Sequence, residues 1–125
     1  MVEPVRFRYN SETGASNSFQ SAPSSAEEQA VADEAVHEHR MLRDLLVSNG
    51  VHVTVVRCDE RTPDAPFCNN WFSTHPAVEL PVAEGTRPAP ATLVLYPLLA
   101  PNRRMERRAD LIAMLRTKYP RMVDF

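Results

Sequence analysis

Apolar side chains in the first half of the chain recur every three to four residues, which is the spacing of one helix face. The members of this stripe, which we expect to be buried, are Val31, Ala35, Leu42, Leu45 and Leu46. Ser25 and Glu28 have the spacing of a capping box. Asn49-Gly50 suits a helix exit, because glycine accepts a left-handed conformation. The pattern therefore predicts a helix over Ser25–Ser48.

Shorter segments alternate apolar and polar residues, or run apolar, over the length of a β-strand. Val51–Val56 follows the first helix directly and places three valines on one face. We expect it to share one small sheet with Asn69–Thr74 and Thr92–Leu95. Val5–Asn10 is a candidate for a further short strand, and residues 121–125 (RMVDF) look like the opening of another.

A second helical stripe near the C-terminal end predicts a helix over Arg103–Tyr119. Its apolar members are Met105, Ala109, Ile112, Leu115 and Tyr119. Asn102 has the residue type of an N-cap, and Pro120 ends the pattern. Helices packed on a sheet make an α/β chain, which we expect to be one domain over residues 1–125.

Two stretches show neither the helical spacing nor the alternation of a strand, and we predict that they are loops. Residues 11–25 are polar and rich in turn-forming residues. Residues 79–91 are rich in proline, which predicts a stiff and exposed connection without a core of its own.

Composition and charge argue against a nucleic-acid-binding, membrane-spanning or secreted protein. A net charge of −2 gives no general attraction to nucleic acid or to an anionic membrane. No segment approaches the roughly 18 apolar residues of a membrane-spanning helix, and residues 1–10 carry charge where a signal peptide needs an apolar run. We expect a soluble cytoplasmic protein, in which Cys58 and Cys68 are reduced thiols.

Histidines and cysteines offer little catalytic chemistry in this pattern. His37 and His39 are two residues apart on the predicted helix, so they lie on different faces and do not share a metal ion. Cys58 follows a strand and is more simply structural. Cys68 has His75 seven residues on, and a thiol needs a neighbouring base or cation to become a thiolate. Sequence proximity alone favours an inert Cys68 over a nucleophile.

Four arginines in NRRMERR begin the second predicted helix, where the helix dipole disfavours positive charge. They are Arg103, Arg104, Arg107 and Arg108. A solvated face is the simplest interpretation, ion pairs that anchor another segment come next, and anion or RNA binding is the third. The chain lacks aromatic residues interleaved with this cluster, which weakens the nucleic-acid hypothesis.

The segment PDAPFCNNWFSTHP (residues 63–76) concentrates polar and aromatic residues between prolines. Asp64 follows a proline with a fixed φ, so its carboxylate is held at a turn, and a turn cap is its simplest role. Asn69 and Asn70 are adjacent amides, each able to donate and to accept hydrogen bonds. Trp71 is more simply a core residue than a ligand contact.

Three motifs together resemble the amidinotransferase family of the pentein superfamily, which includes arginine deiminases and dimethylarginine hydrolases. These motifs are NSETGASNSFQ, PDAPFCNNWFSTH and LYPLLAPNRRMERR. Within the superfamily the resemblance is closest to citrulline-hydrolase-type members. Pro66 and Cys68 depart from the pattern of that branch, which has valine and proline there, and residues 78–91 look like an insertion in a hairpin.

The resemblance implies a fan of five α/β modules, of which this chain would form one to two, without a cofactor or a metal. In such enzymes a cysteine thiolate attacks the planar carbon of a guanidino or ureido group, and acidic residues hold the substrate nitrogens. Asp64 would be one such acid, with Asn69 and Asn70 beside it as substrate-binding amides. The family's cysteine and histidine belong to its C-terminal half, so we expect an N-terminal fragment that binds substrate and is inactive by itself.

Two further hypotheses compete with the inactive fragment. A stand-alone binding or regulatory module could keep the pocket without the chemistry, and an RNA-binding protein could use the arginine cluster. For the fragment we expect a small guanidino or ureido ligand as partner, with neither nucleic acid nor membrane. Because RMVDF would be an unpaired edge, we also expect self-association or a complex with the remainder of the same protein.

Overall fold

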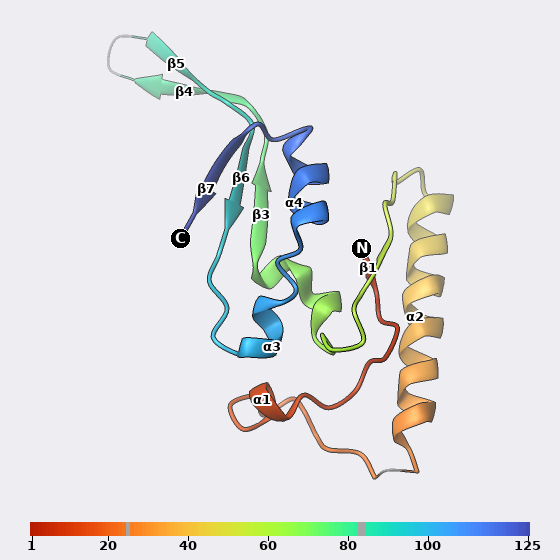
Figure 1. Ribbon diagram of the computed structural model, residues 1–125. Helices are drawn as coiled ribbons and strands as arrows, with labels where there is room; N and C mark the ends of the chain where they lie inside the picture. Colours follow the sequence, from red (N-terminus) through yellow and green to blue (C-terminus); the bar gives the residue numbers. More distant parts are fainter. Residues whose placement is uncertain (25, 83–84) are drawn as a thin grey trace. The chain divides into compact units, whose positions relative to one another are not determined.

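The computed structural model describes every residue except 25 and 83–84, and the side chain of Val82 (Figure 1). The chain divides into two compact units. The first unit contains Met1–Cys68 and Ala100–Glu106, and the second contains Asn69–Leu99 and Arg107–Phe125. Helices and strands occur in both, so the expected mixture of α and β structure is confirmed; the number of propeller modules stays a prediction.

The first unit contains a short pair of parallel strands and the long helix that connects them. Strand β1 (Val2–Glu3) pairs with β2 (Val56–Arg57), and α2 (Glu28–Ser48) lies in the connection between them. Arg40 of α2 bonds to Glu3 of β1 at 2.8 Å. The unit also contains α1 (Ser11–Gly14), a single turn within residues predicted to be a loop.

Both ends of α2 follow from local sequence. Ser25, the predicted partner of Glu28 in a capping box, lies outside the described residues. One residue earlier, Ser24 donates its hydroxyl to Glu27 at 2.6 Å. At the other end Gly50 has φ 80°, and its N–H and that of Val51 bond back to carbonyls of the last turn. This Schellman exit confirms the predicted end of the helix.

The predicted buried stripe of α2 is wrong. Val31, Leu42 and Leu45 are exposed by 38%, 50% and 61%. The half-buried face is turned from them and consists of Ala32, Ala35, Val36, His39, Arg43 and Leu46. Of the predicted stripe, only Ala35 and Leu46 belong to this face. The helical period was correct, but more than one face of the helix carries apolar residues, and the pattern did not show which of them is half-buried.

Two strand predictions in the first unit need correction. Val5–Asn10 is not a strand, because Pro4 precedes a turn at Val5 and the N–H of Val5 bonds to the sulfur of Cys58 at 3.2 Å. Val51–Val56 contributes only its last residue to a strand, because β1 offers just two residues to pair with. It therefore does not share a sheet with the strands of the second unit.

The second unit contains a three-stranded sheet in the order β3-β6-β7. Strand β6 (Thr92–Leu95) has the predicted bounds, and β3 (Phe72–His75) pairs with it antiparallel. Strand β7 (Arg121–Asp124) pairs with β6 in parallel, which confirms the strand predicted there. Trp71, at 1% exposed, is a core residue as expected.

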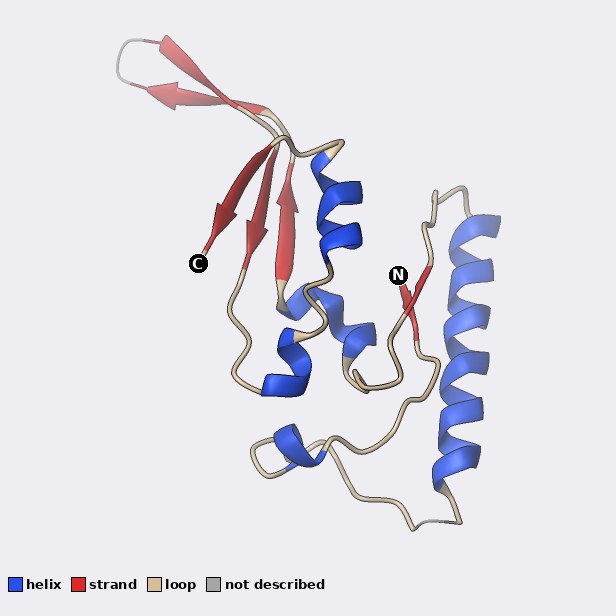
Figure 2. Ribbon diagram, in the orientation of Figure 1, coloured by secondary structure: helices blue, strands red, loops and turns tan. Residues whose placement is uncertain are grey.

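Strands β4 (Val78–Val82) and β5 (Gly85–Ala89) lie in residues that composition predicted to be a loop and that the resemblance indicated to be an insertion in a hairpin, and they form a hairpin (Figure 2). Strand β4 pairs antiparallel with β5. The hairpin continues the chain directions of β3 and β6 beyond the sheet. Its prolines misled the prediction: Pro81 and Pro88 each lack an N–H, yet a two-stranded hairpin has two free edges where a proline is tolerated.

The second predicted helix is split in two. Helix α3 (Pro101–Arg104) begins with proline at its first turn, and α4 (Ala109–Arg116) follows after an extended Arg108 with ψ 134°. Asn102 is therefore not the N-cap, and Ala100 takes that position. Leu111, outside the predicted stripe, is the residue of α4 that is buried.

Candidate functional site

Asp64 lies in the turn before the 3-10 helix η1 (Ala65–Asn70), and only 3% of the residue is exposed. Its Oδ2 accepts hydrogen bonds from Asn10 Nδ2 at 2.7 Å and from Thr13 Oγ1 at 3.0 Å. Its Oδ1 accepts from Gln20 Nε2 at 3.3 Å. The side chain therefore does more than cap a turn: it fastens residues 10–20 to the start of η1.

Asn10 is a second centre of the same network and is 2% exposed. Its Oδ1 accepts from the N–H of Glu12, which caps α1. Asn102 donates its amide to Asn10 Oδ1 at 2.7 Å, and the N–H of Asn102 bonds to Glu12 at 2.9 Å. Three segments far apart in the sequence are joined by these bonds, all of them within the first unit.

A buried ion pair completes the cluster. Arg103 donates to both oxygens of Glu106, at 3.0 and 3.1 Å, and its Nε lies 3.9 Å from Asp64 Oδ2. Burial raises the pKa of Glu106, and this outweighs the opposite effect of the Arg103 guanidinium. We use the term Asp64 cluster for Asn10, Thr13, Gln20, Asp64, Asn102, Arg103 and Glu106.

The two predicted amides belong to a different unit from the predicted acid. Asn69 and Asn70 are the last residues of η1, are exposed, and are counted with the second unit. Asp64 belongs to the first unit, so the three predicted substrate-binding residues are divided between the two units. Their shared role stays a prediction.

Comparison with models of known protein families identifies the family of this chain. The model of the family described as "N,N dimethylarginine dimethylhydrolase, eukaryotic" matches residues 3–125. The chain belongs to this family. No curated protein and no solved structure matches it. Because dimethylarginine hydrolases are among the pentein families that the three motifs resemble, the resemblance is confirmed, while the citrulline-hydrolase branch stays a prediction.

The segments of this dimethylarginine hydrolase-family chain that carry the motifs also carry the Asp64 cluster. Asn10, Thr13 and Gln20 come from the first motif, Asp64 from the second, and Arg103 from the third. Sequence reasoning noticed the motifs but not that their polar residues bind one another. The sequence held a signal for this contact: the first motif is rich in amide and hydroxyl side chains, and such side chains need hydrogen-bond partners when they are buried.

The arginine cluster forms ion pairs. Besides Arg103, Arg107 bonds to Asp124 at 2.6 Å and Arg108 to Asp110 at 2.5 Å. The second of the three interpretations, anchoring of other segments, therefore fits Arg103 and Arg107 better than a freely solvated face.

The candidates for metal and nucleophile chemistry have local partners or none that indicate a reactive site among the described residues. Across the described residues, no group of three metal-ligating side chains is close enough to hold an ion. Cys58 accepts the N–H of Val5, which suits a structural thiol. Cys68 is half-buried in η1, whereas His75 lies in the second unit and bonds to the Ser73 hydroxyl at 2.9 Å.

His39 is an unusual histidine. It lies on the half-buried face of α2, and both ring nitrogens are shielded from solvent without a hydrogen-bond partner among the described residues. Burial lowers its pKa more strongly than Glu3 raises it. A neutral, poorly solvated imidazole suits packing rather than catalysis.

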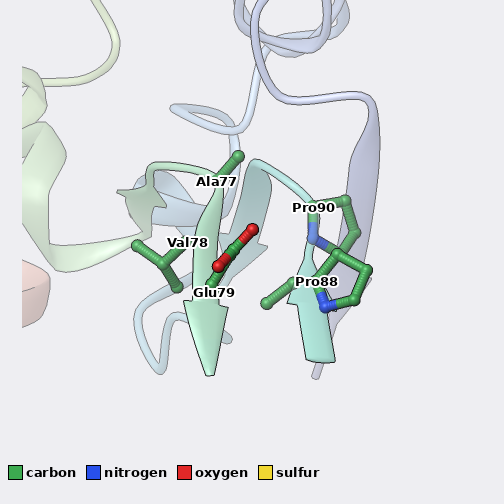
Figure 3. Close-up of a pocket in the computed structure, with 6 residues that line it drawn as sticks. Ala77, Val78, Glu79, Pro88 and Pro90 are labelled. Atoms are coloured by element: carbon green, nitrogen blue, oxygen red, sulfur yellow. The ribbon is translucent and has the colours of Figure 1, made fainter. Parts of the chain in front are cut away.

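Two hollows in the described part of the surface are lined by residues outside the Asp64 cluster. One, of about 480 Å³, is lined mostly by apolar residues at the base of the β4–β5 hairpin, with Glu79 as the charged member (Figure 3). Another, of about 560 Å³, lies in the first unit around Cys58. In the described part of the chain, no helix is long and apolar enough to cross a membrane.

Proposed function

We propose that this chain is the substrate-recognition part of a hydrolase that acts on the guanidino group of methylated arginines or on a related ureido group. The family match over residues 3–125 carries this proposal. The buried Asp64 cluster supports it, since the motifs that resemble the family meet there.

Asp64 is the acid of the proposed site. A carboxylate offers about four acceptor positions, and the described donors use two on Oδ2 and one on Oδ1. One acceptor position on Oδ1 is left for an N–H of the substrate. We propose that Asn69 and Asn70, which are exposed, add amide contacts that suit a cationic guanidinium and a neutral ureido group alike.

Catalysis needs groups that this chain does not offer. The resemblance implies a nucleophilic cysteine and a proton-transferring histidine from the C-terminal half of the family, and no residue among these 125 matches either. We propose that the chain by itself binds substrate without turning it over, requires no cofactor, and acts in the cytoplasm. Its partners are the small ligand and either a second copy or the remainder of the same protein.

The alternative is a stand-alone, non-catalytic binding or regulatory module of the same fold. The polar network supports this alternative, because the three residues that donate hydrogen bonds to Asp64 belong to the same unit as Asp64. The two hypotheses differ in one outcome: a fragment regains turnover when it is mixed with the C-terminal half of a family member, and a stand-alone module does not.

Calorimetric titration with N,N-dimethylarginine, arginine and citrulline tests the proposal. We expect binding that weakens about tenfold or more in an Asn69→Ala, Asn70→Ala double variant, because charge-assisted contacts are lost. Glu79→Gln on the hairpin is the matched control and should bind as the parent does. No heat of binding with any of the three ligands would contradict the proposal.

An assay for released amine or ammonia tests the predicted inactivity. We expect no turnover of these three compounds above background. Turnover that disappears in Cys68→Ala would show that Cys68 is a nucleophile after all.

A further inference from the structure

Strand β7 is the outer strand of the sheet in the second unit. Arg121 and Phe125 donate their main-chain N–H to the carbonyls of Ala91 and Leu95, at 3.3 and 3.2 Å. Because main-chain groups of a strand alternate in direction, the N–H and C=O of Met122 and Asp124 point to the opposite side. Among the described residues these outward groups meet no main-chain partner, so β7 presents an open edge.

We infer that this edge pairs with β7 of a second copy of the same chain, antiparallel and about a two-fold axis. A two-fold interface brings the same surface from both copies together. Only residues with outward main-chain groups can exchange hydrogen bonds, so Met122 of one copy must pair with Asp124 of the other. This register places Val123 opposite Val123 at the axis, and the two sheets become one of six strands.

The side chains agree with this register. The two half-buried Val123 side chains meet as an apolar pair at the centre. On each side Arg121 lies opposite Phe125 of the other copy, a residue that is 72% exposed and whose ring is stacked on Tyr96. A guanidinium beside an aromatic ring is a favourable cation–π pair. The Asp124 carboxylate is already bound by Arg107, so it does not enter the apolar centre.

The two alternative registers are poorer. Pairing Asp124 with Asp124 sets like charges opposite each other, which is destabilising. Pairing Met122 with Met122 brings Pro120 opposite Asp124, and proline has no N–H to donate. The edge is therefore complementary to itself in one register, which is why a second copy fits it. Of the two macromolecular partners named in the proposed function, the inference selects the second copy, and it does not rest on substrate binding because no residue of β7 is assigned to substrate.

Proline at position 122 tests the pairing directly. Met122→Pro removes an outward N–H and leaves the bonds between β7 and β6 in place, since those use Arg121, Val123 and Phe125. We expect the parent chain and Met122→Ala to sediment as dimers at micromolar concentration and Met122→Pro to sediment as a monomer. A monomeric parent, or a dimer that persists in Met122→Pro, would overturn the inference.

A cysteine at the axis tests the register and does not depend on the proline variant folding. In a Cys58→Ser, Cys68→Ser background, Val123→Cys should form a disulfide-linked dimer, because facing residues in a non-hydrogen-bonded pair lie about 4.5 Å apart at Cα. Met122→Cys, whose two copies lie diagonally at about 7–8 Å, should cross-link far less. Equal cross-linking of both variants, or of neither, would contradict the proposed register.

Discussion

At the scale of single residues, Asp64 joins segments of the first unit that are far apart in the sequence. Its carboxylate is buried and accepts three hydrogen bonds from residues 10–20. Nothing in the composition distinguishes it from the exposed aspartates. Its resemblance to a family motif identified it, and the structure explains why the surrounding amides belong to the same motifs.

Asp64→Asn should destabilise the protein by about 1–3 kcal/mol. The new side chain has an NH2 group in place of one carboxylate oxygen, so the amide of Asn10 or of Gln20 loses its buried acceptor. Urea unfolding measures this change. Asp33→Asn is the control, since Asp33 is exposed and bonds only to Gln29 of its own helix among the partners found. A loss of stability equal to that of the control would show that the Asp64 cluster contributes little.

His39 predicts a pH dependence of stability. Burial lowers its pKa in the folded chain below the usual 6.5, so the unfolded chain binds more protons between these two values. Stability from this residue is therefore complete above about pH 6.5 and is lost as the pH falls through that window. Glu3 opposes the shift, while the Met1 ammonium, Arg40 and Arg43 support it.

Thermal unfolding between pH 5 and pH 8 checks this dependence, where His39→Gln should flatten the curve and His37→Gln, at an exposed position, should not. A His39→Gln variant whose melting temperature changes with pH as that of the parent does would contradict the account of His39.

At the scale of elements, the sequence predicted the positions of several helix ends and strands well, but it predicted poorly which elements and faces pack together. The exit of α2, strand β6 and strand β7 are set by glycine placement and by short apolar runs, which act within a few residues. The buried face of α2 was wrong because it depends on what packs against the helix. The split between α3 and α4 was missed because residues 105–108 contain neither glycine nor proline, the residue types that mark a helix break in a sequence.

Gly50 gives a prediction at this scale. Its φ of 80° is a left-handed conformation, which a residue with a side chain adopts at a cost of about 1–2 kcal/mol. Gly50→Ala should therefore lower the stability by about 1 kcal/mol although the position is open to a new Cβ. Urea unfolding checks this value, and an unchanged midpoint would show that the helix end relaxes without cost.

At the scale of the whole molecule, the family is shown by the match over residues 3–125, while substrate binding rests on residues in two separately described units. The sequence could identify Asp64, Asn69 and Asn70 through a motif, since a motif records residue types at fixed spacing. It could not foresee how Asp64 is fastened, because residues 10–20 and 102–106 reach it only through folding. Both proposals, ligand binding and pairing through β7, therefore need measurements on the intact chain.

The most direct test of the central claim is a titration of the ¹⁵N-labelled chain with N,N-dimethylarginine, followed by NMR. We predict progressive shifts of the side-chain amides of Asn69, Asn70 and Gln20, without release of dimethylamine, and no such shifts with an equal concentration of lysine methyl ester, a cation without a guanidino group. Shifts confined to other parts of the chain, or identical shifts with both compounds, would contradict recognition of a guanidino group by these residues.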